Sequence, residues 1–392
     1  MRVLIIGDSN SIHVVNFIRV VLSNSINEID ITLLDLKARE ITNKEASEYY
    51  FENNIRVLLN NGLPQLVKSA LIKKIPKLRV FAHLEQLSKK INGLGYFDYC
   101  IIHFVDSFKS RLIIKNKNNF KNIIPVFWGS DLLRNNQINS SSYRQLFRIS
   151  KKIVLNTENM KKTFENIYNT EFDEKVEVIK FPLISFDKID QLHKTNDIQT
   201  LKKRFNLPMD KFIVICGHSG YKEEQYEKMI ESLSKCKEEV KTKCYFVFLM
   251  TYGPSALVEY QNQIQNLLKK NRLDGRVMCD YLVQDELLSL FLCSDIYITT
   301  ITTDAFSGVM QENFYCESMV IYGKWLNYYE LEANKIFAQP IDNIEQLKEA
   351  LEEVVINYDE IKLHLELNKK LISNVSSPKS IKEIWEKKIF LK

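Results

Sequence analysis

The chain has 392 residues, enough for two domains with separate hydrophobic cores. Hydrophobic residues make up 45% of it and aromatic residues 11%, which is typical of a soluble globular enzyme. The net charge of +5 is too small to indicate nucleic-acid binding, and the sequence contains no DNA- or RNA-binding signature. No stretch approaches the roughly 18 apolar residues of a membrane span, and the opening MRVLIIGDSN predicts a strand rather than a signal peptide.

The seven cysteines are scattered and form no CxxC pair. Most of them lie in or beside apolar runs, namely Cys100, Cys216, Cys244, Cys279 and Cys293. We therefore expect reduced core side chains in a cytoplasmic protein, and neither disulfides nor a zinc site.

The first segments predict half of a doubly wound α/β domain. Val3 to Ile6 reads as a buried strand, Val14 to Leu22 as a helix and Ile29 to Leu34 as the next strand, with a polar loop from Gly7 to His13. That loop is not a GxGxxG sequence, so it does not predict a dinucleotide site.

Residues 63–91 are basic and amphipathic, with seven Lys or Arg side chains against one acid, Glu85, and Pro76 in the middle. Two interpretations remain open. The segment 66–90 would bind an anionic membrane surface, or it forms a helix that packs on its own domain and leaves a solvated lysine face.

Two later strands of the first half end in polar loops. Phe97 to Phe104 predicts a buried strand with His103 at its end, and Val126 to Arg134 predicts a strand and a loop that carries Asp131. Because the carboxyl ends of parallel strands share one edge of a sheet, we expect Asp8, His103 and Asp131 on that edge. They are the candidates for general acid–base catalysis at an acceptor hydroxyl. Trp128 is expected in the core.

A second half follows a polar stretch. We expect a first domain over 1–184, a linker over 185–199, a second domain over 200–375 and a terminal helix over 376–392, with Trp385 and Ile389 as anchors. The second domain begins with a strand, Lys211 to Cys216. The glycine-flanked loop after it predicts a diphosphate site, because backbone N–H groups and a helix dipole would face the anion; its residues are Gly217, His218, Ser219 and Gly220, with Lys222 adding a charge.

Further strands are expected over 245–250 and 277–282, and the stretch from Cys293 to Trp325 predicts a strand, a loop, a helix and another strand. Asp304 lies in that loop, and Glu312 lies eight positions later, in the second turn of a helix that starts near Ser307. Two acids so placed can contact two parts of one polar ligand, and Gly308 lets the backbone approach it closely.

The stretch from Cys293 to Trp325 resembles the retaining glycosyltransferases of family four, which have the two-domain GT-B fold. Their pattern of an acid, seven residues and a glutamate matches Asp304 and Glu312. The chain departs from the pattern where the family usually has Glu, Gly and Pro, at Asp304, Glu317 and Met319. It also has His218 and Lys222, at shifted spacing, where the family usually has Arg and Lys.

A second resemblance covers several loops. The runs Gly217 to Gly220, Met250 to Pro254, Tyr281 to Trp325 and Phe127 to Leu132 are similar to the transferase that moves 4-acetamido-4,6-dideoxygalactose to the lipid carrier of enterobacterial common antigen. The run Gly129 to Asp131 also resembles a tryptophan, glycine, small, aspartate motif of bacterial GT-B enzymes. That transferase family is inverting, whereas family four is retaining, so the stereochemistry stays open.

These resemblances imply an α/β GT-B protein with two Rossmann-like domains facing across a cleft and a C-terminal helix crossing back to the first domain. They imply transfer of a sugar from a nucleotide-diphosphate donor, UDP or dTDP, to a glycan or lipid-linked acceptor in bacterial capsule, O-antigen or lipopolysaccharide synthesis. The protein would be cytoplasmic and peripheral on the inner face of the membrane. Two alternatives are a non-catalytic subunit that scaffolds a partner transferase and a sugar-nucleotide epimerase.

The resemblances also assign roles to residues. Asp304 would hold sugar hydroxyls and Glu312 the ribose. The donor-binding set is Gly217, His218, Ser219, Gly220, Lys222, Tyr252, Gly253, Leu282, Asp304, Phe306, Ser307, Gly308 and Glu312. The acceptor-side residues are Ser9, Asn10 and His13. The catalytic candidates are Asp8, His103, Asp131 and Asp304, where one of the first three is the base of an inverting enzyme or positions the acceptor of a retaining one.

No cofactor and no metal are expected. Many transferases neutralise the diphosphate with a metal ion held by a DxD motif, and the sequence contains no such motif.

Overall fold

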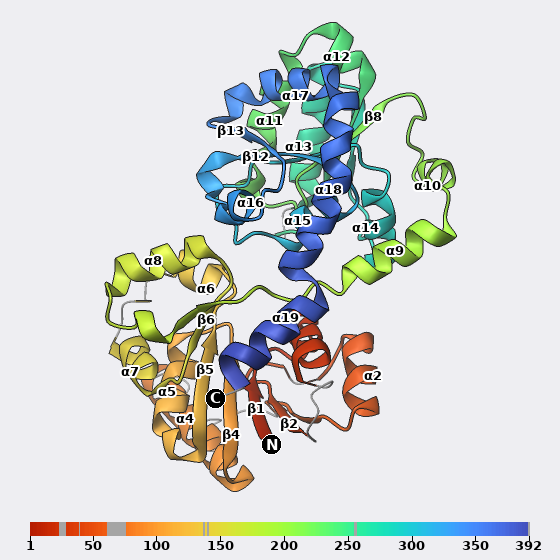
Figure 1. Cartoon of the computed structure of the whole chain (residues 1–392). Helices are drawn as coiled ribbons and strands as arrows, with labels where there is room; N and C mark the ends of the chain where they lie inside the picture. The colour runs from red at the N-terminus through yellow and green to blue at the C-terminus, as the bar shows by residue number, and fades with distance from the viewer. Residues whose placement is uncertain are drawn as a thin grey trace. The chain divides into compact units, whose positions relative to one another are not determined.

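The protein was analysed as a computed structural model that describes residues 1–22, 29–38, 40–60, 76–135, 138, 141–254 and 257–390. Its contacts divide the chain into two compact units. The first comprises residues 1–182 and 378–392, and the second comprises residues 183–377. The elements of each unit are labelled in Figure 1.

The first unit contains a parallel sheet, with seven strands in the described part of the chain. Across the sheet the strands are β3 (Arg56–Leu58), β2 (Asp30–Leu34), β1 (Arg2–Ile6), β4 (Phe97–His103), β5 (Phe120–Val126), β6 (Ile153–Leu155) and β7 (Val176–Val178). The central strands are buried on both faces, because Val3 to Ile6 and Cys100 to Ile102 are fully covered. Such continuous apolar runs are expected of parallel strands with helices on both sides.

The connections of the first unit are mostly helical. They are α1 (Ile12–Phe17), the π-helical turn η1 (Ile18–Leu22), α2 (Lys44–Glu52), α4 (Pro76–Leu94), α5 (Ser107–Lys115), η3 (Lys117–Asn119), α6 (Ser130–Leu133), α7 (Ser141–Ile149), α8 (Glu158–Tyr168) and η4 (Asp173–Lys175). The unit ends with α19 (Pro378–Trp385) and the turn η8 (Glu386–Phe390).

The second unit also contains a parallel sheet, with six strands among the described residues. Across the sheet they are β10 (Gly275–Met278), β9 (Cys244–Leu249), β8 (Phe212–Cys216), β11 (Ile296–Thr299), β12 (Met319–Gly323) and β13 (Gln339–Ile341). Side chains of β8 alternate between two cores, since Val214 and Cys216 pack in one and Ile213 and Ile215 in the other. The sheet is therefore covered on both faces.

The other elements of the second unit surround this sheet. They are α9 (Ser185–Thr195), α10 (Ile198–Arg204), η5 (Lys222–Glu224), α11 (Tyr226–Ser234), α12 (Glu238–Lys243), α13 (Leu257–Lys270), α14 (Gln284–Phe291), α15 (Gly308–Tyr315), η6 (Lys324–Leu326), α16 (Tyr329–Ala333), η7 (Ile344–Gln346), α17 (Leu347–Ile356) and α18 (Tyr358–Ser376).

Each sheet has one point where the strand order reverses. It lies between β1 and β4 in the first unit and between β8 and β11 in the second. The prediction of two doubly wound halves is confirmed. Ligands of such sheets bind outside the carboxyl ends of the strands at this point, so the loops after these four strands are the places to search for a site.

Two sequence expectations need correction. The segment 185–199, expected to be a linker, forms α9 and the start of α10 within the second unit. It looks polar because α9 buries only one narrow face, through Phe186 and Ile189, and Phe186 stacks on Tyr315 with 4.2 Å between ring centroids. The strand expected over 277–282 ends at Met278, and residues 279–283 form a loop before α14.

The C-terminal helix packs on the first unit. Figure 1 shows α19 in blue beside the red N-terminal elements, and the ring centroids of Trp385 and Phe17 are 4.8 Å apart. Trp385 and Ile389, the predicted anchors, are both buried. Residues from the two ends of the chain therefore share one core.

None of the helices in the described ranges is both long enough and apolar enough to cross a bilayer.

Replacing Trp385 by Ala should lower the free energy of unfolding by about 3–5 kcal/mol, because it leaves a large cavity beside Phe17. Urea unfolding measures the loss. Lys387→Ala, an exposed change in the same terminal segment, is the control and should change stability little. Equal stability of the two variants would show that the helix does not complete this core.

Candidate functional site

The loop after β8 forms one side of the reversal point in the second unit. Gly217 has a φ of 61°, and a Cβ there would collide with the Tyr226 side chain. Glycine is therefore required at the first position after the strand. The Tyr226 hydroxyl lies 2.7 Å from the Ser219 carbonyl and 2.9 Å from that of Leu249, which ties the loop to the end of β9.

A fully buried acid, Glu224, organises this loop. Its Oε1 accepts a hydrogen bond from the Ser219 hydroxyl at 2.7 Å and lies 3.1 Å from Nδ1 of His218. The predicted loop residues thus have different roles. Ser219 is buried and bonded inside the loop, whereas His218 is partly exposed and held by a carboxylate behind it.

The loops after β8 and β9 touch through two glycines. The N–H of Gly220 donates to the Tyr252 carbonyl at 2.7 Å, and a Cβ on Gly253 would lie 3.2 Å from the carbonyl carbon of Gly220. The exposed Tyr252 side chain stands at the same edge. The part of this side chain that is buried, followed by the charges of Glu224, Tyr221 and Asp304, raises the pKa of Tyr252 to about 12, so its hydroxyl stays protonated at neutral pH.

The loop after β11 forms the other side of the reversal point and carries Asp304. One oxygen of this carboxylate accepts hydrogen bonds from the Ser307 N–H at 2.7 Å and the Tyr328 hydroxyl at 2.6 Å. Asp304 therefore shapes its own loop through Oδ2. Its other oxygen, Oδ1, makes no hydrogen bond within the described residues and can accept one from a ligand.

Helix α15 begins directly after this loop. Ser307 is its N-cap and accepts from the Met310 N–H, as the sequence predicted for a helix starting near Ser307. Glu312 lies in the second turn and is partly buried. Burial raises the pKa of Glu312, while the Ser185 hydroxyl and His218 lower it. His218 and Glu312 are thus near enough for their charges to interact, although one lies in the loop after β8 and the other in helix α15.

Three predicted donor residues have side chains that contact other parts of the second unit. Phe306 has a φ of 61° and a buried ring that packs on Tyr328, so only its backbone faces the loop. The Lys222 ammonium lies 6.0 Å from the centre of the Tyr260 ring. Leu282 lies in the loop after β10 and is partly buried against one of the two hydrophobic cores of the second unit.

In the first unit, the reversal point opens into a cavity of about 260 Å³. Two of the predicted catalytic residues, Asp8 and His103, line it. So do Asp35, Lys109 and Trp128, which the sequence did not assign to the site. The cavity therefore joins the loops that follow β1, β2, β4 and β5.

His103 is fully buried and neutral. Burial lowers its pKa to about 3, and Lys109 and His13 add to the shift. The Trp128 Nε1–H donates to His103 Nδ1 at 3.1 Å, so the ring proton of a neutral imidazole belongs on Nε2. Nε2 has no partner among the described residues. The geometry thus favours His103 as a hydrogen-bond donor rather than as a base.

Asp131 is also buried, and both oxygens of its carboxylate accept hydrogen bonds from the protein. It accepts from the N–H groups of Val105, Trp128 and Gly129, each at 2.9 Å. Burial raises the pKa of Asp131 and these three bonds oppose the shift. Asp8, by contrast, is exposed and accepts one backbone N–H, from Asn10 at 2.9 Å. Of the three candidates, Asp8 has the carboxylate most available to a substrate.

Of the predicted acceptor-side residues, two are bonded within the protein and one is exposed. Ser9 is buried, and both its N–H and its hydroxyl donate to Asp35. The Asn10 side chain accepts from the N–H groups of Thr42 and Asn43 and fastens the loop before α2. His13 is exposed, with its ring centroid 5.2 Å from that of Trp128.

Lys109 was not predicted as a site residue, because nothing in the sequence of α5 distinguishes this lysine from a solvent-exposed one. It is 7% exposed, and its ammonium donates to the carbonyls of His103 and Phe104 at 2.8 and 2.7 Å. Trp128 was expected in the core, but it is only partly buried and lines the cavity. Asp35 could have been predicted, because it is a polar residue directly after the second strand.

No cluster of three or more His, Cys, Asp or Glu side chains suited to a metal ion occurs in the described part of the chain. Metal independence stays a prediction.

The chain superposes along its whole length on solved glycosyltransferase structures. A glycosyltransferase from Rickettsia africae ESF-5 gives a TM-score of 0.73 at 14% identity, covering 100% of this chain and 99% of the other. Alr3699/HepE from Anabaena, solved with UDP and glucose, gives 0.71 at 12% identity, with 98% and 97% covered. The trehalose-6-phosphate synthase OtsA gives 0.70 at 10% identity, with 100% and 99% covered. The chain has the GT-B fold.

At these identities the likeness establishes the GT-B fold alone. No family model matches the sequence, and no curated protein matches it either. Membership of family four, or of the family of the enterobacterial common antigen transferase, therefore stays a prediction.

Acidification should destabilise the first unit through His103. The folded imidazole stays neutral down to about pH 3, whereas the unfolded one binds a proton below its ordinary value of 6.5. The unfolded state therefore gains a proton between these values, and stability falls by up to about 1.4 kcal/mol per pH unit as the pH drops.

Urea unfolding across this pH range measures the slope, and His103→Gln should reduce it. His193→Gln, at an exposed histidine of α9, should leave the slope unchanged. An identical slope in all three proteins would show that His103 takes up its proton in the folded state.

Proposed function

We propose that the chain is a glycosyltransferase that moves a sugar from a nucleotide-diphosphate donor to a glycan or lipid-linked acceptor in bacterial surface polysaccharide synthesis. The observation that carries the proposal is the convergence of His218, Asp304 and Glu312 on one reversal point of a parallel sheet. Loops from β8 and β11 bring them together. The GT-B structures similar to the chain include one with UDP and glucose bound, which supports a UDP-sugar donor.

The donor loops offer the groups that such a substrate needs. Asp304 Oδ1 would accept hydrogen bonds from sugar hydroxyls, and Glu312 from the ribose hydroxyls. The diphosphate would lie at the N-terminus of α15, where the first N–H groups of a helix have no intrahelical acceptor and the helix dipole favours an anion. His218 would donate a hydrogen bond to the diphosphate, with the Glu224 carboxylate 3.1 Å from its Nδ1 on the other side of the ring.

The acceptor would bind to the first unit, in the cavity lined by Asp8 and His103. Its hydroxyl oxygen forms a bond to the anomeric carbon, the bond from that carbon to the diphosphate oxygen breaks, and the hydroxyl proton must be taken up. In an inverting enzyme Asp8 would take this proton, because Asp131 is buried with both oxygens bonded to backbone N–H groups and His103 is itself a donor. In a retaining enzyme Asp8 would only orient the acceptor.

A peripheral position on the membrane belongs to the same proposal. Residues 61–75, which hold Lys68, Lys73 and Lys74 of the basic segment, lie outside the described residues, as does the side chain of Lys77. On the described part of α4, Leu87 and Ile91 are buried, whereas Leu78, Val80 and Phe81 are exposed. Exposed apolar side chains beside basic ones support contact with an anionic bilayer.

UDP or dTDP should stabilise the second unit without magnesium. A nucleotide at about 100 times its dissociation constant adds roughly 2.7 kcal/mol, which raises the melting temperature by about 5–11 °C for a unit of this size, at about 2–4 °C per kcal/mol. A thermal-shift panel of UDP, dTDP, GDP, CMP and ADP, with and without magnesium, measures the effect.

Glu312→Gln should abolish most of this shift while the protein without ligand melts normally. Glu317→Gln, at the end of the same helix, is the matched control and should respond as the wild type does. The donor site is wrongly assigned if Glu312→Gln binds nucleotide with wild-type affinity. A shift only with magnesium would contradict metal independence.

Asp8→Asn should leave the nucleotide-induced shift intact and, in an inverting enzyme, lower kcat by about 10²–10⁴-fold, the usual contribution of a general base. Asp173→Asn, at an exposed aspartate of the same unit, is the control. Proton NMR of the product gives its anomeric configuration. An inverted product formed at the wild-type rate by Asp8→Asn would exclude Asp8 as the base.

A further inference from the structure

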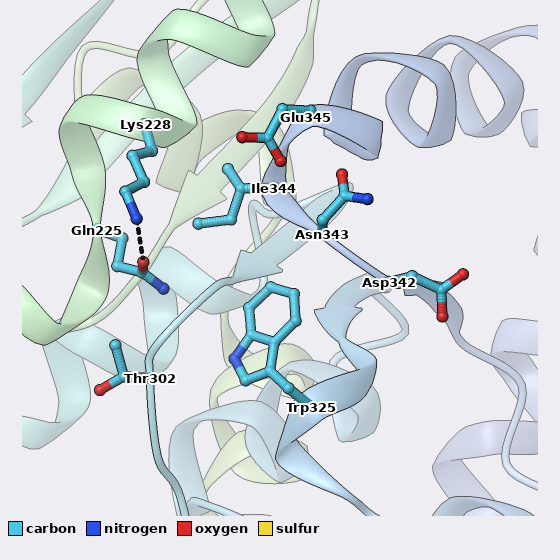
Figure 2. A pocket seen from close by; sticks show the side chains of 8 residues that line it. All are labelled: Gln225, Lys228, Thr302, Trp325, Asp342, Asn343, Ile344 and Glu345. Atoms are coloured by element: carbon cyan, nitrogen blue, oxygen red, sulfur yellow. Dashed lines mark hydrogen bonds between the residues drawn. The ribbon is translucent and has the colours of Figure 1, made fainter.

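A second cavity of the same sheet edge shares the loop after β11 with the candidate donor site but contains neither Asp304 nor His218. Its volume is about 360 Å³, within the range of about 300–1,000 Å³ of small-molecule sites. Thr302 after β11, Trp325 after β12 and Glu345 after β13 line it, together with Lys228 from α11 (Figure 2). Their positions show that the cavity is on the β13 side of the sheet.

The floor of this cavity is the indole of Trp325, whose orientation is fixed. Its Nε1–H donates to the Ile301 carbonyl at 2.9 Å. A Cβ on Gly323 would collide with the ring, so the indole lies directly against that glycine. The ring is partly exposed and stands next to Ile344 in Figure 2. The cavity therefore offers a rigid aromatic surface that loses little conformational entropy when a ligand covers it.

Polar groups surround the indole and can make further hydrogen bonds. The Glu345 carboxylate makes no hydrogen bond or ion pair within the described residues, and it points toward the cavity in Figure 2. The Asn343 oxygen accepts from the Gln346 N–H, which leaves its amide group as a donor. Lys228 donates to Gln225 at 3.2 Å and has two further N–H groups. Thr302 adds a hydroxyl that can donate or accept.

The backbone is strained where it enters this cavity. Gln225 has φ 61° and ψ 38°, the left-handed conformation that non-glycine residues seldom adopt. Its side chain donates to the Thr300 carbonyl at 2.6 Å and accepts from Lys228. Backbone strain of this kind is concentrated at binding sites, and here it holds Lys228 and the loop of Thr302 in place.

The charges of the cavity select against an anion. Lys228 is opposed by Glu345 and Asp342, and Asp342 is shared with Lys324 at 3.3 Å. A phosphate or nucleotide would meet two carboxylates. A pyranose ring, by contrast, has an apolar C–H face that can cover an indole and a rim of hydroxyls that both donate and accept.

We propose that this cavity is a binding site for a neutral saccharide, separate from the nucleotide site at the reversal point. Trp325 carries the sugar face, Glu345 accepts from hydroxyls, and Asn343 and Lys228 donate to them. The proposal needs no transferase activity, so it stands or falls independently of the proposed function.

The test is a titration followed by the indole N–H resonance of Trp325, assigned by its loss in Trp325→Phe. The probes are methyl α-glucoside, methyl α-galactoside, N-acetylglucosamine, maltose and lactose, each with UDP present in excess. Glucose 6-phosphate is the anionic comparison. At least one neutral saccharide should shift the resonance saturably at concentrations up to tens of millimolar.

Glu345→Gln should weaken that binding about tenfold, since a hydrogen bond to a charged group is lost, and Thr302→Val should weaken it less. Glu353→Gln, which neutralises an exposed carboxylate on α17, is the matched control and should bind as the wild type does. The proposal is overturned if none of the five saccharides shifts the resonance, if Glu345→Gln binds the same saccharide with unchanged affinity, if glucose 6-phosphate binds more tightly, or if UDP displaces the saccharide.

Discussion

In a parallel sheet with right-handed crossovers, the two connections beside the point where the strand order reverses pass to opposite faces of the sheet. The loops that begin these connections therefore separate from each other and leave a crevice. Both sheets of this chain reverse beside their first strand, at β1 and β8. The loops after these strands therefore cannot be covered by their own helices. Asp8 follows one of them in the first unit, and His218 follows the other in the second unit. The other candidate groups of each unit lie on loops after neighbouring strands or on the helices that follow them, as Lys109 on α5 and Glu312 on α15 do.

Much of this arrangement was predictable, because strands buried on both faces read as continuous apolar runs. The runs ending at Ile6 and Cys216 placed the polar loops after them correctly, whereas the apolar run from Ile296 to Ile301 continues two residues beyond the end of β11 at Thr299. Helix α18 was not anticipated. Its buried positions Ile361, Leu365, Asn368 and Ile372 have helical spacing, but Asn368 interrupts the apolar pattern, and its amide is satisfied only by the backbone of Phe337, far away in the sequence.

The chemistry of the site residues was less predictable than their positions. Asp131 and Asp35 have the residue type and the strand-end location of catalytic acids, yet each is consumed by three backbone N–H groups. Those bonds fix the loops after β5 and β2 and leave neighbouring groups exposed. Whether a carboxylate binds its own loop or a ligand depends on loop conformation, which a single sequence does not encode in residue type. In the same way, buried Glu224 accepts hydrogen bonds from its own loop, whereas His218 is left partly exposed.

The loop after β11 connects the proposed donor residues to the proposed saccharide cavity. Thr302 lines the cavity, and Asp304 lies two residues further along. The loop is held at Thr300 by Gln225, and the Thr302 N–H donates to the Glu223 carbonyl, next to the Glu224 that orients His218. A ligand that stabilises this loop through Thr302 also stabilises the position of Asp304, and by thermodynamic reciprocity a donor bound at Asp304 favours the cavity to the same extent. The shared loop thus gives the second unit a physical route for coupling two ligands through a few hydrogen bonds.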